Sequence, residues 1–159
     1  MKKISLLFVA FLVGCSTTIN NNSFLLKDYY LEYKSFTGTP REKGFVKDEL
    51  WATLVSAREK ANKSAFVNSL ASFPTEMTQH TDFKEQVANN SGCLLVSGVN
   101  SKKIPMDYYL TFEQNDEKWI ISDITVKYFF DGAERFLKEA ECNEEKRMHL
   151  WLEYIQSKD

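Results

Sequence analysis

The chain lacks any block of basic residues. Its 159 residues include 20 Lys and Arg against 22 Asp and Glu, which gives a formal charge of −2 at pH 7. Binding to nucleic acids and to anionic lipid surfaces depends on clustered positive charge. The sequence therefore gives no electrostatic support to either function, and we expect no nucleic-acid partner.

Familiar catalytic motifs are also missing. The sequence contains no glycine-rich phosphate loop, no serine-centred nucleophile elbow and no cluster of residues at metal-ligand spacing. His80 lies two residues from Asp82 on a predicted helix, where residues two apart do not share a face. His149 lies in a charged helical segment. We interpret both histidines as structural and assign no catalytic residue, metal or cofactor.

The apolar run at the start of the chain is too short for a permanent membrane span. Ten residues, 4–13, are apolar apart from Ser5 and follow Lys2 and Lys3. As a helix they would extend roughly 15 Å, about half of a ~30 Å hydrocarbon core. A positive leader, a short apolar run and small residues at its end are typical of a secretory signal peptide.

The end of this run is Leu12-Val13-Gly14-Cys15, which resembles the lipobox of bacterial lipoproteins. The resemblance implies that the Cys15 thiol receives a diacylglyceryl group, that the Gly14–Cys15 bond is cut and that the new amino terminus is acylated. A thiolate is the nucleophile that such a thioether requires, and two or more acyl chains anchor a protein stably. The alternatives are an ordinary signal peptide with an incidental cysteine and a buried apolar segment.

The lipobox divides the chain into three parts. These are a signal peptide (residues 1–14), a lipidated Cys15 with a polar tether (residues 15–23) and a single α+β domain (residues 24–159) of ordinary size. Ser16 follows the cysteine where the inner-membrane signal of enteric-type bacteria has aspartate. By resemblance to that sorting rule, we expect an anchor in the outer membrane, a periplasmic domain, and two partners: the bilayer and an envelope protein.

Two cysteines remain in the expected domain, Cys93 and Cys142. Disulfides persist outside the cytosol, so an even pair there favours a bridge. Closing the intervening loop would contribute roughly 4 kcal/mol in the chain-entropy description. Two free, buried thiols are the alternative.

Hydrophobic periodicity predicts helices, then antiparallel strands, then helices, which defines the α+β class. The N-terminal half is predicted to hold a helix over 24–36 (a strand is the alternative), a loop over 37–44 and helices over 45–60, 62–70 and 75–87. A strand over 93–99 and a hairpin of 106–112 and 118–128 follow. The chain then forms a helix that Asp131 caps and whose apolar face is Phe136, Leu137 and Ala140, and a last helix over 143–156. We expect the N-terminal helices to pack on a small, curved, cone-like sheet, with a C-terminal helical extension.

The late segment Trp119-Ile120-Ile121-Ser122-Asp123-Ile124 is similar to a Trp-x-Ile-x-Asp-Ile strand sequence. Through it, residues 45–128 resemble small lipoproteins with the cone-shaped, cystatin-like fold of the nuclear transport factor two superfamily. The chain departs from that pattern by showing only three clear strands and by its C-terminal extension.

The resemblance implies a pocket inside the curved sheet, where enzymes of the superfamily place carboxylates and tyrosines. Tyr108, Tyr109 and Asp123 are the candidates for such a pocket. The alternative is that Asp123 faces water together with Thr125 and Lys127.

Two functions remain open at this point. The first is a membrane-anchored, non-catalytic binding module that docks on an envelope protein or neutralises a toxin or hydrolase. The alternative is a small-pocket enzyme or an apolar ligand carrier that uses the cone interior. A filled interior with an exposed aromatic patch favours the first, and an open pocket lined by Asp123 and tyrosines favours the second.

Overall fold

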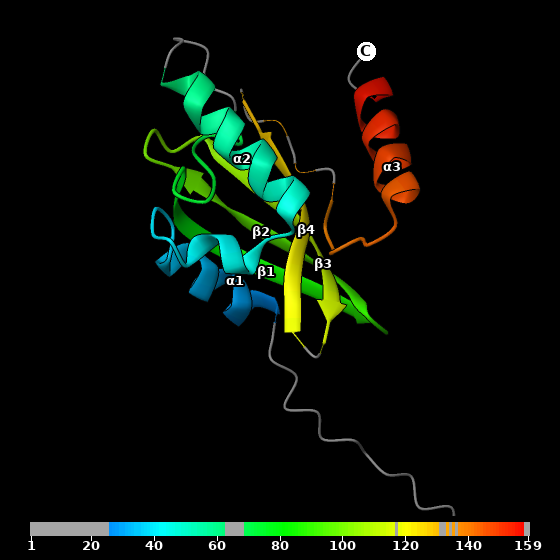
Figure 1. Cartoon of the computed structure of the whole chain (residues 1–159). Coiled ribbons are helices and arrows are strands. Elements are labelled where there is room, and N and C mark those ends of the chain that lie inside the picture. The colour runs from blue at the N-terminus through cyan, green and yellow to red at the C-terminus, as the bar shows by residue number, and fades with distance from the viewer. Residues whose placement is uncertain are drawn as a thin grey trace, which may run out of the picture.

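The structure is a computed structural model that describes residues 26–62, 69–116, 118–130, 133, 135 and 137–157. Its elements, in chain order, are α1 (Leu26–Ser35), η1 (Glu42–Phe45), α2 (Asp48–Ala61), β1 (Met77–Ala88), β2 (Ser91–Asn100), β3 (Pro105–Asn115), β4 (Lys118–Tyr128) and α3 (Glu144–Gln156) (Figure 1). The predicted signal peptide, Cys15 and the tether lie outside the described residues.

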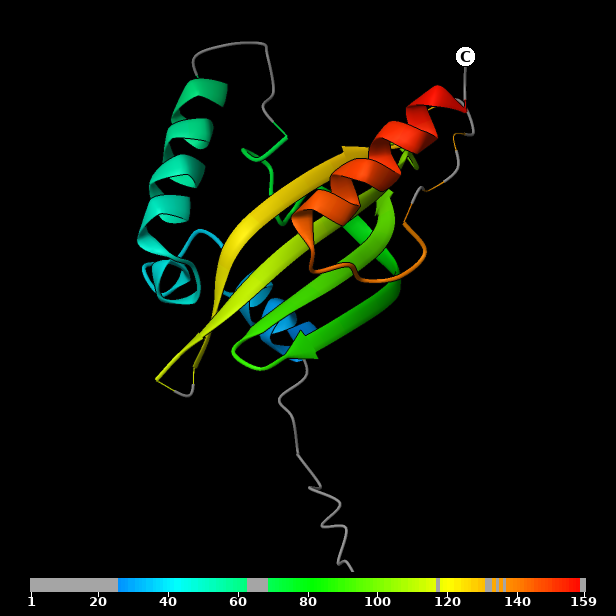
Figure 2. The same cartoon turned by 90° about the vertical axis from the view of Figure 1, so that its right-hand side faces the viewer.

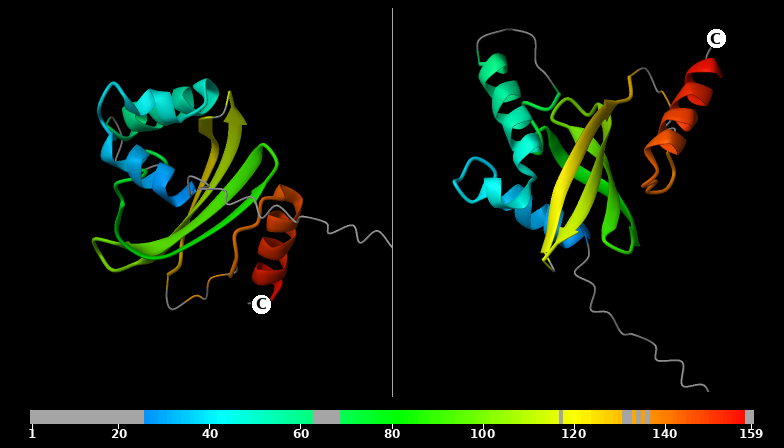
Figure 3. Two further views of the ribbon diagram at one scale, coloured as in Figure 1. Left: turned by 90° about the horizontal axis from the view of Figure 1, so that it is seen from below. Right: turned by 45° about the vertical axis from the view of Figure 1, so that its right-hand side comes forward.

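The four strands form one antiparallel sheet in the order β1-β2-β3-β4. The sheet is curved, and helices lie on both of its faces (Figure 2). Helices α1 and α2 cover one face, which we call the inner face, and α3 lies over the opposite, outer face (Figure 3). The predicted α+β class is confirmed.

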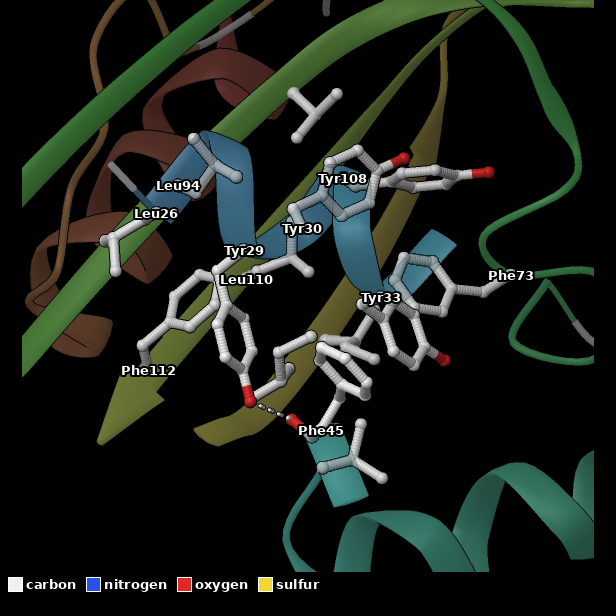
Figure 4. Close-up of a cluster of buried hydrophobic side chains, with 14 of the residues drawn as sticks. Leu26, Tyr29, Tyr30, Tyr33, Phe45, Phe73, Leu94, Tyr108, Leu110 and Phe112 are labelled. Carbon is white, nitrogen blue, oxygen red and sulfur yellow. Dashed lines mark hydrogen bonds between the residues drawn. The ribbon is translucent and has the colours of Figure 1, made fainter. Parts of the chain in front are cut away.

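The inner face carries the main core. Along β3 the predicted alternation holds, because Met106, Tyr108, Leu110 and Phe112 all lie fully buried on this face. Figure 4 shows how the aromatic side chains of α1 fill the space between helix and sheet. The hydroxyl of one of them, Tyr29, donates to the carbonyl oxygen of Phe45 at 3.4 Å.

The first helix begins close to where its periodicity predicts it. Leu26, Tyr29, Tyr30 and Tyr33 are buried at steps of three and one residues, so a single stripe of α1 faces the sheet. The helix is confirmed, and the strand alternative for this segment is wrong. The second predicted helix, over 45–60, is confirmed as α2, but it begins only at Asp48, because Phe45 is the last residue of η1 and Val46 pairs with Ile121 in an isolated bridge.

The segment 75–87, predicted as a third helix, is strand β1, so that prediction is wrong. β2 is buried on both faces and needs a hydrogen-bonding partner on each edge, which β1 supplies on one side. Asn89 and Asn90, interpreted from the sequence as a helix stop, form the two-residue turn between the strands, with Asn89 at φ 54°. Pairing with an apolar neighbour outweighs a weak helical pattern, and the sheet has four strands instead of the three predicted.

Two other predicted helices have different outcomes. Most of the helix over 62–70 lies outside the described residues, and so do Asp131 and Phe136 of the segment after β4. The described residues of that segment, including Leu137 and Ala140, are not helical. Leu137 packs against Leu95 and Tyr109 of the sheet, and Ala140 lies beside this cluster.

The last helix is confirmed as α3. The break predicted near Cys142 and Asn143 does not separate two helices, because the described residues before it are not helical, and the Asn143 side chain caps α3 by accepting a hydrogen bond from the backbone N–H of Lys146 at 2.9 Å.

Strand β4 turns its apolar residues differently from the prediction. Ile121, not Ile120, lies in the core. The pairing of β3 with β4 shifts register between Thr111 and Phe112, which leaves Ser122 as an extra residue. A bulge of this kind moves later side chains by one position, and period-two reasoning cannot detect it.

Candidate functional site: the groove between helix α3 and the sheet

The outer face is crossed by the chain that links β4 to α3. Leu137 is buried against Leu95 and Tyr109, in a small cluster separate from the main core. Lys84 on β1 donates to the carbonyl oxygen of Lys138. Its ammonium also lies 3.1 Å from a carboxylate oxygen of Glu139. A few specific contacts therefore hold this segment on the sheet.

A buried ion pair reinforces the attachment. Asp107 on β3 is fully buried, and Arg135 donates from Nε to its Oδ1 at 2.7 Å. Arg135 also donates to the carbonyl oxygen of Gly98 at 3.2 Å, and the hydroxyl of Tyr109 lies 3.5 Å from Oδ2. Burial raises the pKa of Asp107, and the hydrogen bonds from Arg135, Ser97 and Tyr109 offset part of that rise.

A disulfide fixes the start of α3. The Sγ atoms of Cys93 on β2 and Cys142 are bonded at 2.13 Å, with the two Cα atoms 5.2 Å apart. Cys142 immediately precedes the helix cap Asn143. The bridge therefore places the first turn of α3 over the outer face.

Beyond this attachment, Leu150 of α3 packs on the cluster of Leu95, Tyr109 and Leu137, and a groove remains beside it between the helix and the sheet. None of its residues is buried. A cavity of about 110 Å³ lies between the helix and the outer face. Its lining residues are Tyr109, Asp123, Thr125, Lys127, Leu137, Glu144, Arg147, Met148 and Trp151. At the disulfide end it adjoins a larger hollow of about 340 Å³ that also includes Thr111, Glu113, Ser122 and Cys142.

The three residues predicted to share a pocket do not come together. Tyr109 and Asp123 both line this groove on the outer face. Tyr108 is fully buried on the inner face, where its hydroxyl accepts a hydrogen bond from the backbone N–H of Met77 at 2.9 Å. Asp123 is exposed beside Thr125 and Lys127, in agreement with the alternative placement.

Two of the groove's cationic side chains are held by neighbouring groups. The ammonium of Lys127 lies 4.2 Å from the centre of the Trp151 ring, in a cation–π contact. Arg147 donates to the carbonyl oxygen of Glu141 at 3.2 Å. These contacts restrict where the two positive charges sit relative to the groove.

The inner face holds a second buried charge, with a structural role. Glu42 is 1% exposed, and Arg58 donates to both of its carboxylate oxygens, at 2.6 and 3.2 Å. Tyr33 and the backbone N–H of Gly38 complete its hydrogen bonds, at 2.9 and 2.7 Å. Burial alone would raise the pKa of Glu42, but these donors outweigh it and hold the pKa below its usual value. A carboxylate so fully bonded ties η1 to α1 and α2.

The two histidines lie on different elements, His80 on β1 and His149 on α3. His80 is half-buried on β1, where its Nε2 lies 3.2 Å from the Lys34 ammonium and 3.3 Å from the Tyr30 hydroxyl. Both groups can donate to this nitrogen in the neutral ring. Burial, and then the Lys34 charge, lower the pKa of His80. His149 is exposed on α3, 3.4 Å from Glu153.

Sequence reasoning missed Asp107 and Arg135, the buried ion pair that helps to attach the outer segment. The strand alternation already placed Asp107 on the same face as Tyr109, away from Tyr108. A charged residue inside an apolar strand was the signal that could have identified Asp107. Its partner was not visible, because Arg135 is 28 positions away in a segment that the sequence predicted as a separate helix.

Comparisons with known proteins add no assignment, since no family model, curated protein or solved structure matches the chain. Within the described ranges, no helix is long and apolar enough to cross a bilayer. In the same residues, no three His, Cys, Asp or Glu side chains gather as a metal site.

Proposed function

We propose that this chain is a lipid-anchored protein of the bacterial cell envelope, attached through Cys15 and acting as a non-catalytic binding module. The domain would work in the periplasm, at the outer membrane, by docking on an envelope protein. Support for the anchor comes from Leu12-Val13-Gly14-Cys15 and the apolar run before it.

The filled inner face supports binding at another surface. Tyr30, Tyr33, Phe73, Tyr108 and Phe112 interlock there as fully buried side chains. The hydroxyls of Tyr33 and Tyr108 are already bonded to Glu42 and to the backbone of Met77. The region in which a cone fold would hold a small ligand is therefore occupied by the protein's own aromatic rings.

The observation that carries the proposal is the exposed apolar stripe of α3. Met148, Leu152 and Ile155 are 54%, 50% and 41% exposed, at spacings of four and three residues. Residues so spaced lie along one side of a helix, and an exposed apolar stripe of this kind is typical of a protein-docking surface. We define these three residues as the docking stripe.

The position of the docking stripe favours a protein over the bilayer as its occupant. α3 lies on the opposite face of the sheet from α1, at whose first residue the chain from Cys15 enters the domain (Figure 3). An anchor at Cys15 would bring the bilayer to the α1 side. The helix surface also carries charges of both signs, as in Glu144, Glu145, Lys146 and Arg147, which suits a protein surface with polar groups around an apolar centre.

The anchor is tested by labelling cells with a palmitate analogue. The full chain should be labelled and should fractionate with the outer membrane, and Cys15→Ser should accumulate as an unlabelled precursor. Cys142→Ser is the matched control and should keep the label. Labelling of Cys15→Ser would overturn the assignment of the anchor.

Docking is tested by placing a photo-crosslinking amino acid in the full chain in cells, at Leu152 or, as control, at Leu31 on α1, which is 37% exposed. We expect an adduct with one exported envelope protein from position 152 only, and loss of that adduct when Ile155→Asp is added. An adduct with a second copy of this chain, equal adducts from both positions, or no adduct would contradict the proposal.

A further inference from the structure

The groove beneath α3 gathers charges of both signs in a small space. Asp123 and Glu144 bring two carboxylates, and Lys127 and Arg147 bring two cations. The carboxylates and cations come from both walls, since Asp123 and Lys127 project from β4 while Glu144 and Arg147 project from the facing side of α3. Tyr109 and Met148 add apolar surface between them.

These charges do not neutralise one another. Among the ion pairs of the described residues, none joins Asp123 or Glu144 to Lys127 or Arg147. The two carboxylate side chains accept no hydrogen bond from any described residue. The cations, in contrast, are positioned by Trp151 and by the carbonyl oxygen of Glu141. Because these four charged groups do not pair with one another, they can form ion pairs and hydrogen bonds with a ligand in the cavity.

The cavity limits the size of that ligand. Its volume is about 110 Å³. An apolar cavity of ~150 Å³ accommodates the six non-hydrogen atoms of benzene, so roughly four or five fit here. The hollow beside it is larger, about 340 Å³, and leaves room for substituents on that ligand. A lone phosphate or a simple cation would satisfy only one sign of the charge.

We propose that this groove binds a small zwitterion, a molecule with one ammonium and one carboxylate group on a short carbon skeleton, as in the simplest α-amino acids. Arg147 and Lys127 bind the carboxylate, and Asp123 and Glu144 bind the ammonium. Charge-assisted hydrogen bonds of both signs give orientation as well as affinity. The Cys93–Cys142 bridge holds the first turn of α3 over the site, so the two walls are arranged before the ligand arrives.

This site goes beyond the proposed docking function and does not depend on it. Leu152 and Ile155 of the docking stripe do not line the groove, and only Met148 belongs to both. A failure of docking would appear at position 152, and a failure of ligand binding would appear at positions 123 and 147.

The test is equilibrium dialysis of the purified, lipidated full chain against radiolabelled glycine and L-alanine. We expect one saturable site per chain for at least one of them. Unlabelled propionate and ethylammonium, each with a single charge, should compete at least about tenfold less well than the unlabelled zwitterion. Arg147→Gln and Asp123→Asn should each weaken binding about tenfold or more.

The matched control is Glu145→Gln, which removes a carboxylate from the exposed side of the same helix turn and should leave binding unchanged. Circular dichroism of each variant checks that the fold is intact. No saturable binding below about 10 mM would overturn the proposal. So would propionate competing as well as the zwitterion, which would indicate a simple anion site, or equal binding by all three variants.

Discussion

The two faces of the sheet are covered in different ways. On the inner face, α1, η1 and α2 enclose a continuous core of large aromatic and aliphatic side chains. On the outer face, a non-helical segment and one helix are attached through an ion pair, a disulfide and a three-residue apolar cluster. The free energy gained from apolar burial grows with the area buried, whereas an ion pair or a disulfide stabilises only the segments that it joins. The inner face therefore supplies most of the stability, and the outer face keeps charged and apolar groups accessible for binding.

The largest expected effect is truncation of the inner core. Phe112→Ala should lower the free energy of unfolding by about 4 kcal/mol, because it removes a fully buried ring and leaves a cavity. Phe130→Ala, at a ring that is 59% exposed, is the matched control and should cost less than about 1 kcal/mol. Urea unfolding followed by circular dichroism measures the loss of unfolding free energy in both variants. Equal losses would contradict the difference in burial between Phe112 and Phe130.

Removing the disulfide should have the next largest effect. The bonded cysteines are separated by 49 positions, and Cys93→Ser with Cys142→Ser should cost at most about 4 kcal/mol by freeing the unfolded chain. Because the bridge attaches only the outer segment, limited proteolysis should cut first between Leu137 and Gln156. A first cut within α1 or β3 would contradict the localisation of the effect.

A smaller loss is expected from the buried carboxylate of the inner face. Glu42→Gln should cost about 2 kcal/mol, since the Arg58 guanidinium loses its charged acceptor. Glu42 has a lowered pKa, so its stabilisation is present above the usual pKa of 4.5 and is lost as pH falls through the folded-state pKa. The variant should therefore lose less stability than the wild type below pH 4.5, and exposed Glu49→Gln should not differ from wild type.

The smallest effect concerns His80. Its pKa is lowered by burial and by Lys34, so between its usual value of 6.5 and the folded-state pKa the unfolded chain binds more protons. Stability should decrease as pH falls below 6.5. His80→Gln should flatten this slope in urea midpoints taken from pH 7.5 to 5.5, while exposed His149→Gln should keep it. A wild-type slope in His80→Gln would mean that another group is responsible.

The sequence predicted the parts of this fold that depend on local pattern. Residues spaced like Leu26, Tyr30 and Tyr33 require one helical face, and the alternation from Met106 to Phe112 requires a half-buried strand. Strand β1 was not predictable in this way, because its side chains are mostly exposed and its pairing is set by β2. The shift at Ser122 depends on how β3 and β4 meet, which no single strand encodes.

The candidate site was predicted only in part. Period-two alternation separates Tyr108 from Tyr109, yet both were assigned to one pocket because the resemblance to a cone fold placed tyrosines inside it. Asp123 was identified, but its neighbours Glu144 and Arg147 come from a helix whose position depends on the Cys93–Cys142 bridge. Contacts between distant segments carry no periodic signal, so the groove became visible only in three dimensions.

The most direct test of the difference between the two faces is native-state hydrogen exchange of the disulfide-bonded full chain. Amides of β2 and β3 should exchange only through global unfolding, whereas those of α3 should exchange through local opening at a free energy at least about 2 kcal/mol lower. If α3 exchanged with the same free energy and the same denaturant dependence as β3, the outer helix would belong to one cooperative unit with the core. That result would contradict the division of the molecule into a stable inner face and a locally attached outer one.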